Sequence, residues 1–267
     1  MLAIHRFLLT RTPRLYFHVR NIGRKAVGTR RKQRTLFSEL IRPGDLVFDV
    51  GANIGEFSAA FRDCGARVVS VEPQPRLTAH LRRRFGADPE VTVVATALSD
   101  HAGEATLFCT SADALATLEE ARVTGAVGAG AELEWNDTIQ VPLRTLEALV
   151  AEYGPPVLVK IDVEGHEAGV VRGLTTTRPS LFFEVNRESV DEVLDLLADR
   201  GYTDFLLREG ERPDWVSRRP VPAAEMRALI AATETDCDCL ALSPDAALVG
   251  DRRPAEAPGS VSDARDR

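Results

Sequence analysis

Cysteine is scarce in this sequence, and its spacing indicates neither a metal site nor a redox motif. The four cysteines are Cys64, Cys109, Cys237 and Cys239, and no two of them form a C-x-x-C pair. Cys237 and Cys239 are two residues apart, so we predict that both lie on one face of a strand as small buried side chains. The cysteines therefore give no evidence for zinc binding or thiol redox chemistry.

Long apolar runs are also missing. The first residues, MLAIHRFLLTRTPRLYF, are interrupted by His5, Arg6 and Arg11, and no small-residue cleavage site follows an apolar stretch. A transmembrane helix needs about 20 predominantly apolar residues, and a signal peptide needs an apolar segment before its cleavage site. We therefore predict neither, and expect a cytoplasmic protein with reduced thiols.

Positive charge is unevenly distributed. The chain has only three lysines and a net charge of -7, which argues against a general nucleic-acid binder. Residues 1–36 nevertheless contain ten Lys or Arg and no acid. We predict a basic helical arm over residues 1–38, which is either simply solvated or makes weak contact with a membrane surface or an anionic substrate.

The remaining chain alternates strand-like and helical segments. Its 267 residues and 44% apolar composition suit one α/β domain with extensions, or at most two small domains. Apolar runs typical of buried parallel strands lie at 46–50, 67–71, 91–97, 157–163 and 181–185, and helical patterns lie at 55–64, 75–85, 145–153, 166–174 and 189–200. This alternation predicts an α/β fold with a doubly wound, mostly parallel sheet over residues 39–250.

Two segments depart from this alternation. Residues 106–141 contain two strand-like stretches around a Gly- and Ala-rich middle, which predicts a β-hairpin insertion with a mobile loop between the third and fourth core strands. We expect the insertion, around residues 111–135, and the basic arm to border the acceptor site. Residues 251–267 are rich in Pro, Ala and charge, and we predict a disordered tail.

The stretch VFDVGANIG at the end of the first predicted strand has the features of a cofactor-binding turn. Gly51 and Gly55 allow a sharp turn and the close approach of a ligand. Asp49 favours a cationic amino-acid ligand over a pyrophosphate, and Glu72 at the end of the second strand suits two ribose hydroxyls. S-adenosylmethionine has both groups. Because GANIG lacks the G-x-G-x-x-G spacing, a nicotinamide-dependent dehydrogenase is the less favoured alternative.

Two further polar residues have alternative interpretations. Asn53 either lines the amino-acid pocket or adopts the left-handed conformation that Asn tolerates in turns. Asp100, at the end of ATALSD, either accepts a hydrogen bond from the adenine amino group or belongs to a polar turn before Gly103.

Several motifs in order resemble one methyltransferase family. The stretches FDVGANIGEFS, VVSVEPQP, ATALSD, VLVKIDVEGHEAGVVRGL and LFFEVN, from about Leu46 to Asn186, are similar to the FkbM family of S-adenosylmethionine-dependent methyltransferases. The resemblance implies a Rossmann-like class I methyltransferase fold and methyl transfer to an oxygen of a small molecule or glycan. It also implies that the residues matching Asp49, Gly51, Asn53, Gly55 and Glu72 hold the cofactor. Such sequences commonly carry His at the position of Asn186.

The motif KIDVEGHE supplies candidates for the chemistry. Alternation along a strand places Lys160, Asp162 and Glu164 on one face, and Glu184 on the next strand faces the same crevice. Buried charges are costly unless they are paired or functional. A hydroxyl acceptor requires a base, and His166 has the most suitable unperturbed pKa.

Other interpretations of these residues remain open. Asp162 or Glu184 can replace His166 as the base, Lys160 and Asp162 can form a structural ion pair, and His166 can be a polar surface residue. Carboxylates and His166 can also bind magnesium, but the spacing does not require it, and we predict no metal. The predicted site thus has catalytic residues His166, Asp162 and Glu184, cofactor-binding residues Asp49, Gly51, Asn53, Gly55, Glu72 and Asp100, and acceptor-binding residues Lys160 and Glu164. A binding module without catalysis is the non-enzymatic alternative.

Overall fold

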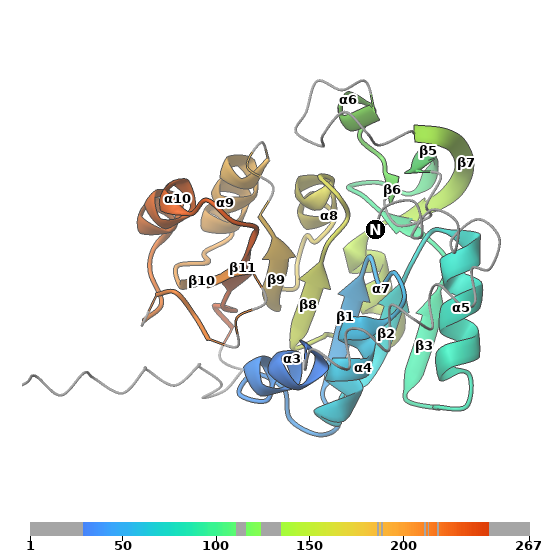
Figure 1. Ribbon diagram of the computed structural model, residues 1–267, viewed down its shortest axis with the longest axis horizontal. Coiled ribbons are helices and arrows are strands. Elements are labelled where there is room, and N and C mark those ends of the chain that lie inside the picture. The colour runs from blue at the N-terminus through green and yellow to red at the C-terminus, as the bar shows by residue number, and fades with distance from the viewer. Residues whose placement is uncertain are drawn as a thin grey trace, which may run out of the picture.

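A computed structural model of the chain describes residues 29–110, 116–123, 135–185, 187, 189–210, 212, 214–217 and 219–245. Its centre is a seven-stranded sheet in the order β10-β11-β9-β8-β1-β2-β3 (Figure 1). The strands are β1 Leu46–Val50, β2 Arg67–Val71, β3 Val91–Val94, β8 Leu158–Ile161, β9 Ser180–Glu184, β10 Phe205–Glu209 and β11 Cys237–Ala241. Neighbours from β9 to β3 are parallel, and β11 is antiparallel to both β9 and β10. The predicted doubly wound, mostly parallel sheet is confirmed.

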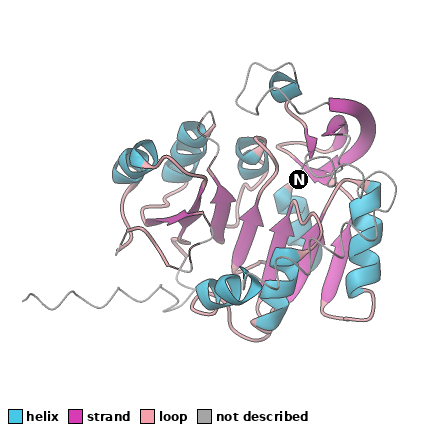
Figure 2. Cartoon of the chain, in the orientation of Figure 1, coloured by secondary structure: helices cyan, strands magenta, loops and turns pink. Residues whose placement is uncertain are grey.

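Helices cover both faces of this sheet (Figure 2). They are α3 Thr29–Phe37, α4 Glu56–Asp63, α5 Pro75–Phe85, α7 Leu146–Tyr153, α8 Glu167–Arg172, α9 Val190–Asp199 and α10 Ala223–Ala232. Consecutive strand residues face opposite layers, so Phe48 packs in the core under α7 to α10 while Val47 packs in the core under α3 and α4. β1 is buried along its whole length, as expected for a central parallel strand.

The five helices predicted between residues 55 and 200 agree with α4, α5, α7, α8 and α9 to within two residues at each end, whereas α10 was not predicted. Local signals explain several of the boundaries. Pro75 opens α5, where its missing N–H costs nothing. Thr145 caps α7, and its Oγ1 accepts a hydrogen bond from the backbone N–H of Ala148 at 3.1 Å.

A second sheet lies beyond the carboxyl ends of β1 and β8 (Figure 1). It has the order β4-β7-β5-β6, with strands β4 Ala97–Leu98, β5 Gly103–Thr110, β6 Ala116–Thr117 and β7 Trp135–Arg144, and the short helix α6 Glu120–Val123 follows β6. Strands β5 and β7 are antiparallel, which confirms the predicted hairpin insertion. The middle of its loop, which we predict to be mobile, lies outside the described residues.

Two predicted strand ends are wrong. The third core strand ends at Val94 instead of Ala97, because Ala97 and Leu98 pair with Leu143 and Arg144 of the second sheet. Strand β8 ends at Ile161, so residues 162–165 form a turn in which Glu164 has a φ of 55°. The alternation of side chains along β8 therefore determines which face Lys160 lies on, but it does not determine the position of Glu164.

The ends of the chain are described only in part. Residues 1–28 of the predicted basic arm, the predicted tail of residues 251–267, and Asn186 lie outside the described residues. The last residues of the arm form α3, whose Leu36 and Phe37 are buried in the core, so the predicted boundary at residue 38 passes through packed structure. Among the helices that the structure describes, none has the length and hydropathy needed to cross a membrane.

Candidate functional site

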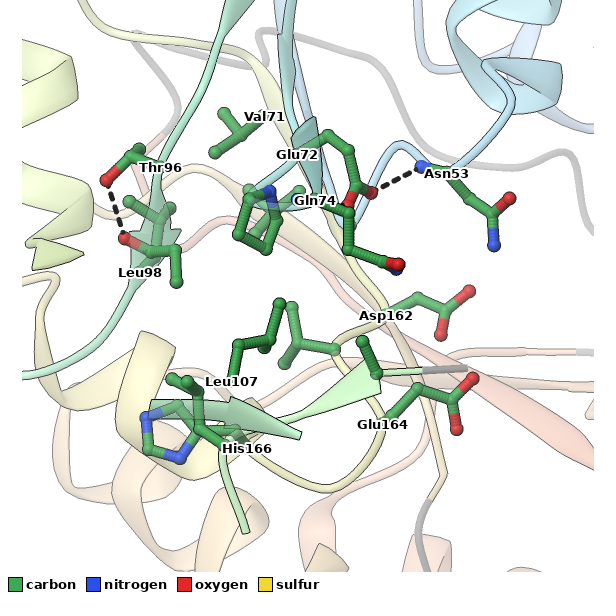
Figure 3. Close-up of a pocket in the computed structure, with 17 residues that line it drawn as sticks. Asn53, Val71, Glu72, Gln74, Thr96, Leu98, Leu107, Asp162, Glu164 and His166 are labelled. Carbon is green, nitrogen blue, oxygen red and sulfur yellow. Dashed lines mark hydrogen bonds between the residues drawn. The ribbon is translucent and has the colours of Figure 1, made fainter. Parts of the chain in front are cut away.

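A pocket lies where the carboxyl ends of β1, β2 and β8 meet the second sheet (Figure 3). This is the end of an open α/β sheet at which ligands bind, beside the point where the strand order reverses. Its lining residues are Val50, Gly51, Asn53, Val71, Glu72, Pro73, Gln74, Thr96, Ala97, Leu98, Leu107, Ala116, Leu118, Asp162, Val163, Glu164 and His166. Six predicted site residues are therefore brought together here: Gly51, Asn53, Glu72, Asp162, Glu164 and His166.

Glu72 and Asn53 form one wall of the pocket. The backbone N–H of Asn53 donates to Glu72 Oε2 at 2.9 Å, and the backbone N–H of Gln74 donates to Oε1 at 3.0 Å. A carboxylate has about four acceptor sites, so two accepted bonds leave capacity for a pair of hydroxyls. Asn53 has a φ of 50°, which confirms the left-handed turn conformation that we considered for it.

The Glu72 carboxyl is nearly inaccessible in the ligand-free protein. Burial raises its pKa to about 7, although the two backbone N–H groups and Lys160 act in the opposite direction. A ligand that donates hydrogen bonds to the carboxylate favours its charged form and opposes this shift.

The two predicted glycines have different roles. A Cβ on Gly51 would lie 1.8 Å from the carbonyl oxygen of Asp162, and Gly51 has a φ of 71°. Gly51 therefore allows the β1 turn to pack against the turn after β8, and it lines the pocket. A Cβ on Gly55 would lie 2.6 Å from Phe85, away from the pocket lining. Gly55 therefore makes room for α5, and its cofactor-binding role stays a prediction.

Asp49 and Lys160 lie beneath the pocket and do not line it. Asp49 is fully buried, and the Ser58 hydroxyl donates to its Oδ2 at 2.5 Å. The Lys160 Nζ lies 3.4 Å from both Asp49 and Asp162 and donates to the carbonyl oxygen of Gly51 at 2.8 Å. In this geometry the amine is a structural cation that holds the turn, and the acceptor-binding role of Lys160 stays a prediction.

Lys160 remains charged in this setting. Burial lowers the pKa of its amine, but the Asp162 and Asp49 carboxylates outweigh burial and raise the pKa above its usual value. The alternative that we kept open, a structural ion pair between Lys160 and Asp162, agrees with these contacts.

An apolar wall faces Glu72 across the pocket. Leu98 comes from β4, while Leu107, Ala116 and Leu118 come from the insertion. These positions suit the flat face of an adenine ring. Leu98 belongs to the stretch ATALSD, whereas Leu107, Ala116 and Leu118 were not predicted to face the cofactor. Asp100 is exposed instead of lining the pocket, and its hydrogen bond with His101 lowers the pKa of its carboxyl. This placement favours the polar-turn interpretation of Asp100.

Acidic side chains gather at the other edge of the pocket. Asp162 and Glu164 line it, and Glu184 at the end of β9 completes a set of three whose carboxylate oxygens lie within 4.8 Å of one another. Burial and the neighbouring carboxylates of Asp162, Glu164, Glu167 and Asp238 raise the pKa of Glu184 to about 9. Burial and the neighbouring negative charges therefore favour the protonated form of Glu184.

This acidic set has two chemical capabilities. Its oxygens can orient and deprotonate a hydroxyl, and oxygen ligands of this kind are also those that magnesium prefers. Our prediction that the site needs no metal stays a prediction.

His166 is placed away from the acidic edge. In Figure 3 its ring lies beside Leu107, on the opposite side of the pocket from the carboxylates of Asp162 and Glu164. Its Nδ1 lies 2.6 Å from Glu119 Oε1, and its Nε2 lies 2.9 Å from the Ser99 hydroxyl. Both ring nitrogens are therefore engaged, which disfavours the predicted catalytic role.

Glu167 supports the turn that carries these groups. Its Oε1 accepts hydrogen bonds from the backbone N–H groups of Val163, at 3.2 Å, and Gly165, at 3.0 Å. Sequence reasoning missed Glu167, Glu119 and Ser99. A glutamate two residues after a glycine turn is a detectable signal for Glu167. Glu119 and Ser99 reach His166 through long-range packing, which no local signal indicates.

Comparisons with known proteins show the family of the chain. The family described as "Methyltransferase FkbM domain" matches residues 49–203. A 31-O-demethyl-FK506 methyltransferase FkbM from Streptomyces tacrolimicus is 33% identical over 193 residues, covering 61% of this chain and 74% of that protein. A 2-O-methyltransferase NoeI from Sinorhizobium fredii (strain NBRC 101917 / NGR234) is 27% identical over 170 residues, covering 58% and 69%.

Solved structures resemble the chain more distantly. The C-terminal domain of precorrin-6Y C5,15-methyltransferase from Rhodobacter capsulatus has a TM-score of 0.41 and 15% identity, covering 78% of this chain and 85% of that one. At this distance the likeness carries no information about the acceptor.

Proposed function

Since this chain belongs to the FkbM methyltransferase family and uses S-adenosylmethionine, we propose that it methylates a hydroxyl oxygen of a small-molecule or sugar acceptor. The observation that carries this proposal is the charge of the pocket. Three carboxylates line it, those of Glu72, Asp162 and Glu164, and its described lining residues include no Lys or Arg. Carboxylates suit a sulfonium cation and the hydroxyl groups of a ribose and an acceptor.

The chain offers a distinct surface to each part of the cofactor. Glu72 is placed to accept hydrogen bonds from the ribose hydroxyls, and the apolar wall with Leu98 and Leu107 is placed to pack against the adenine. Gly51 and Asn53 border the amino-acid end. When bound, S-adenosylmethionine supplies a methyl group from its sulfonium sulfur, and this sulfur becomes a neutral thioether that needs no protonation to leave.

The acidic edge of the pocket, with Asp162, Glu164 and Glu184, removes the proton from the acceptor hydroxyl. As the acceptor oxygen forms its bond to carbon, its O–H bond breaks and the proton passes to a carboxylate. Asp162 lines the pocket and is half-buried, so it is the base that we assign. Glu184, protonated at neutral pH, is placed to donate a hydrogen bond that orients Asp162 or the acceptor.

The alternatives fit less well. A dinucleotide pyrophosphate would meet the carboxylates of Asp162 and Glu164 in place of a glycine-rich cradle. A nucleic-acid acceptor would bring phosphates to the same edge, where the described lining residues supply no cation. We therefore propose an uncharged or cationic hydroxylated acceptor.

Calorimetry with S-adenosylmethionine, S-adenosylhomocysteine and NAD tests the cofactor assignment. We expect micromolar binding of the first two by the wild type, lost in Glu72→Ala and retained in Glu104→Ala, an exposed acid in β5. Binding of NAD alone would contradict the proposal. With binding established, radiolabelled methyl transfer to panels of hydroxylated macrolides, sugars and RNA, followed by NMR of the product, tests the acceptor class.

A further inference from the structure

Three side chains from separate parts of the chain are joined through His166. Glu119 belongs to the insertion just before α6, Ser99 follows β4, and His166 precedes α8. The contacts are 2.6 Å from His166 Nδ1 to Glu119 Oε1 and 2.9 Å from His166 Nε2 to Ser99 Oγ. The insertion is thereby connected to the turn that carries Asp162 and Glu164.

The Glu119 carboxylate decides which proton the ring offers at their contact. An ionised carboxylate only accepts hydrogen bonds, so Nδ1 carries the proton that it donates to Glu119. The Ser99 hydroxyl has a second acceptor within reach, Asp100 Oδ1 at 3.2 Å, so Nε2 either accepts the Ser99 proton or donates its own to the Ser99 oxygen. The nitrogen that a general base would use is already occupied, and Ser99 is buried.

Gly169 is a second, independent sign that the ring position matters. It lies inside α8, where Ala is a better helix former than Gly. A Cβ at this position would lie 2.3 Å from His166 Nε2 and 2.5 Å from its Cε1. The absent side chain makes room for the His166 ring.

The segment held by Glu119 forms part of the pocket. Ala116 and Leu118 line it, and the Thr117 hydroxyl donates to the carbonyl oxygen of Glu164 at 2.9 Å. The backbone N–H of Glu119 in turn donates to the Thr117 hydroxyl at 3.0 Å. Residues 116–119 therefore have two anchors on the turn after β8, and His166 provides one of them.

We propose that Glu119, His166 and Ser99 form a positioning relay that holds residues 116–119 against the cofactor pocket. His166 is then a positioning residue and not the base that deprotonates the acceptor. This inference rests on the proposed function for the identity of the ligand. It adds to that function the way in which Ala116 and Leu118, the part of the apolar wall that comes from residues 116–119, are held in place.

Calorimetric binding of S-adenosylhomocysteine to four full-length variants tests the relay. We expect Glu119→Ala and His166→Ala to bind about tenfold more weakly, as for loss of a charge-assisted hydrogen bond. His166→Asn, which keeps a donor near Nδ1 but has no imidazole, should recover most of the affinity. Glu120→Ala is the matched control, because Glu120 is the adjacent acid and is exposed, and it should bind like the wild type.

Two measurements on the ligand-free protein keep the test independent of binding. In ¹⁵N-histidine NMR spectra, the His166 signal should show a protonated Nδ1 and change in Glu119→Ala. Limited proteolysis within residues 116–123 should be faster in Glu119→Ala and His166→Ala than in Glu120→Ala. Thermal unfolding verifies that each variant is folded.

The outcomes separate the two proposals. If the wild type binds S-adenosylhomocysteine and all four variants bind equally, the relay is wrong while the proposed function stands. If His166→Asn and His166→Ala abolish methyl transfer equally with binding unchanged, His166 is the base and the relay is again overturned. If the wild type binds neither S-adenosylmethionine nor its product, both proposals fail.

Discussion

The Glu72 carboxyl favours the protonated form without cofactor and the charged form when ribose hydroxyls donate to it. Burial favours the protonated carboxyl and raises its pKa to about 7. Ribose hydroxyls donate hydrogen bonds and favour the carboxylate, so binding of the cofactor is coupled to loss of a proton.

This coupling predicts a pH-dependent affinity. Below the folded pKa of about 7, each binding event must remove a proton from Glu72, so the affinity for S-adenosylhomocysteine should fall as the pH falls. We expect binding at pH 6 to be roughly five- to tenfold weaker than at pH 8. Glu72→Gln should bind more weakly at pH 8 and lack this dependence. Calorimetry at several pH values would contradict the assignment if both proteins showed the same slope.

Gly51 has a left-handed backbone and also lies against the backbone of Asp162. The cost of a side chain in each of these two situations can be measured separately. A Cβ at Gly51 would lie 1.8 Å from the Asp162 carbonyl oxygen, whereas one at Gly44 would have no atom within 4 Å. Both glycines have a positive φ, 71° and 86° respectively. Gly44→Ala therefore reports the backbone strain, expected at about 1 kcal/mol.

Gly51→Ala should cost more because the turn after β8 must move as well. We expect a loss of roughly 3 kcal/mol in the free energy of unfolding, measured by urea denaturation. The cofactor should also bind more weakly, since Asp162 moves with the turn. An equal loss in both variants would show that the two turns are not packed as described.

At the scale of elements, α3 is held by aromatic packing. The Phe37 ring meets Phe57, Phe61 and Phe182 edge to face, with centroids 6.1, 5.0 and 5.1 Å away. These partners come from α4 and β9, so the helix closes one side of the sheet and is part of the domain core.

Removing this ring should destabilise the whole domain. We expect Phe37→Ala to lower the free energy of unfolding by about 3–5 kcal/mol, because Phe37 is fully buried. Thr35→Ala, on the exposed side of the same helix, is the control and should change it by less than about 1 kcal/mol. Urea denaturation gives both values. A small loss in Phe37→Ala would indicate that α3 can detach without cost.

Hydrophobic periodicity predicted the helices and strands whose boundaries are set by local sequence. It failed at boundaries that are set by pairing with a distant part of the chain. The pattern at 75–85 gave α5 because Pro75 and an apolar stripe specify it locally. In contrast, Ala97 and Leu98 continue an apolar run yet pair with Leu143 and Arg144 of another sheet. No local signal distinguishes these two residues from a longer β3.

The candidate site divides in the same way. Glu72 was predictable because it ends a strand at a fixed distance from a glycine turn. The contacts of His166 with Ser99 and Glu119 span 67 and 47 residues, and no spacing rule connects them. The sequence places Lys160 and Asp162 together, but only the structure shows that Lys160 lies beneath the pocket.

Across the whole molecule, acidic groups concentrate at the carboxyl ends of β8 and β9. The pKa of Glu184 is about 9 and that of Asp238 about 6, each raised mainly by burial. In the unfolded chain both carboxyls ionise at their ordinary values. The folded state therefore binds more protons than the unfolded state between about pH 4 and pH 9.

The ligand-free protein should consequently lose stability as the pH rises through this window. For Glu184 the loss begins above its ordinary pKa of 4.5 and is complete only above about 9. Glu184→Gln removes the ionisable group and should stabilise the protein by on the order of 1–3 kcal/mol at pH 8.5, with little effect at pH 5. Urea denaturation of both proteins at the two pH values measures this difference. If Glu184→Gln were equally stabilising at both pH values, packing and not ionisation would be the cause, and burial and the carboxylates of Asp162 and Glu164 would not raise the pKa of Glu184.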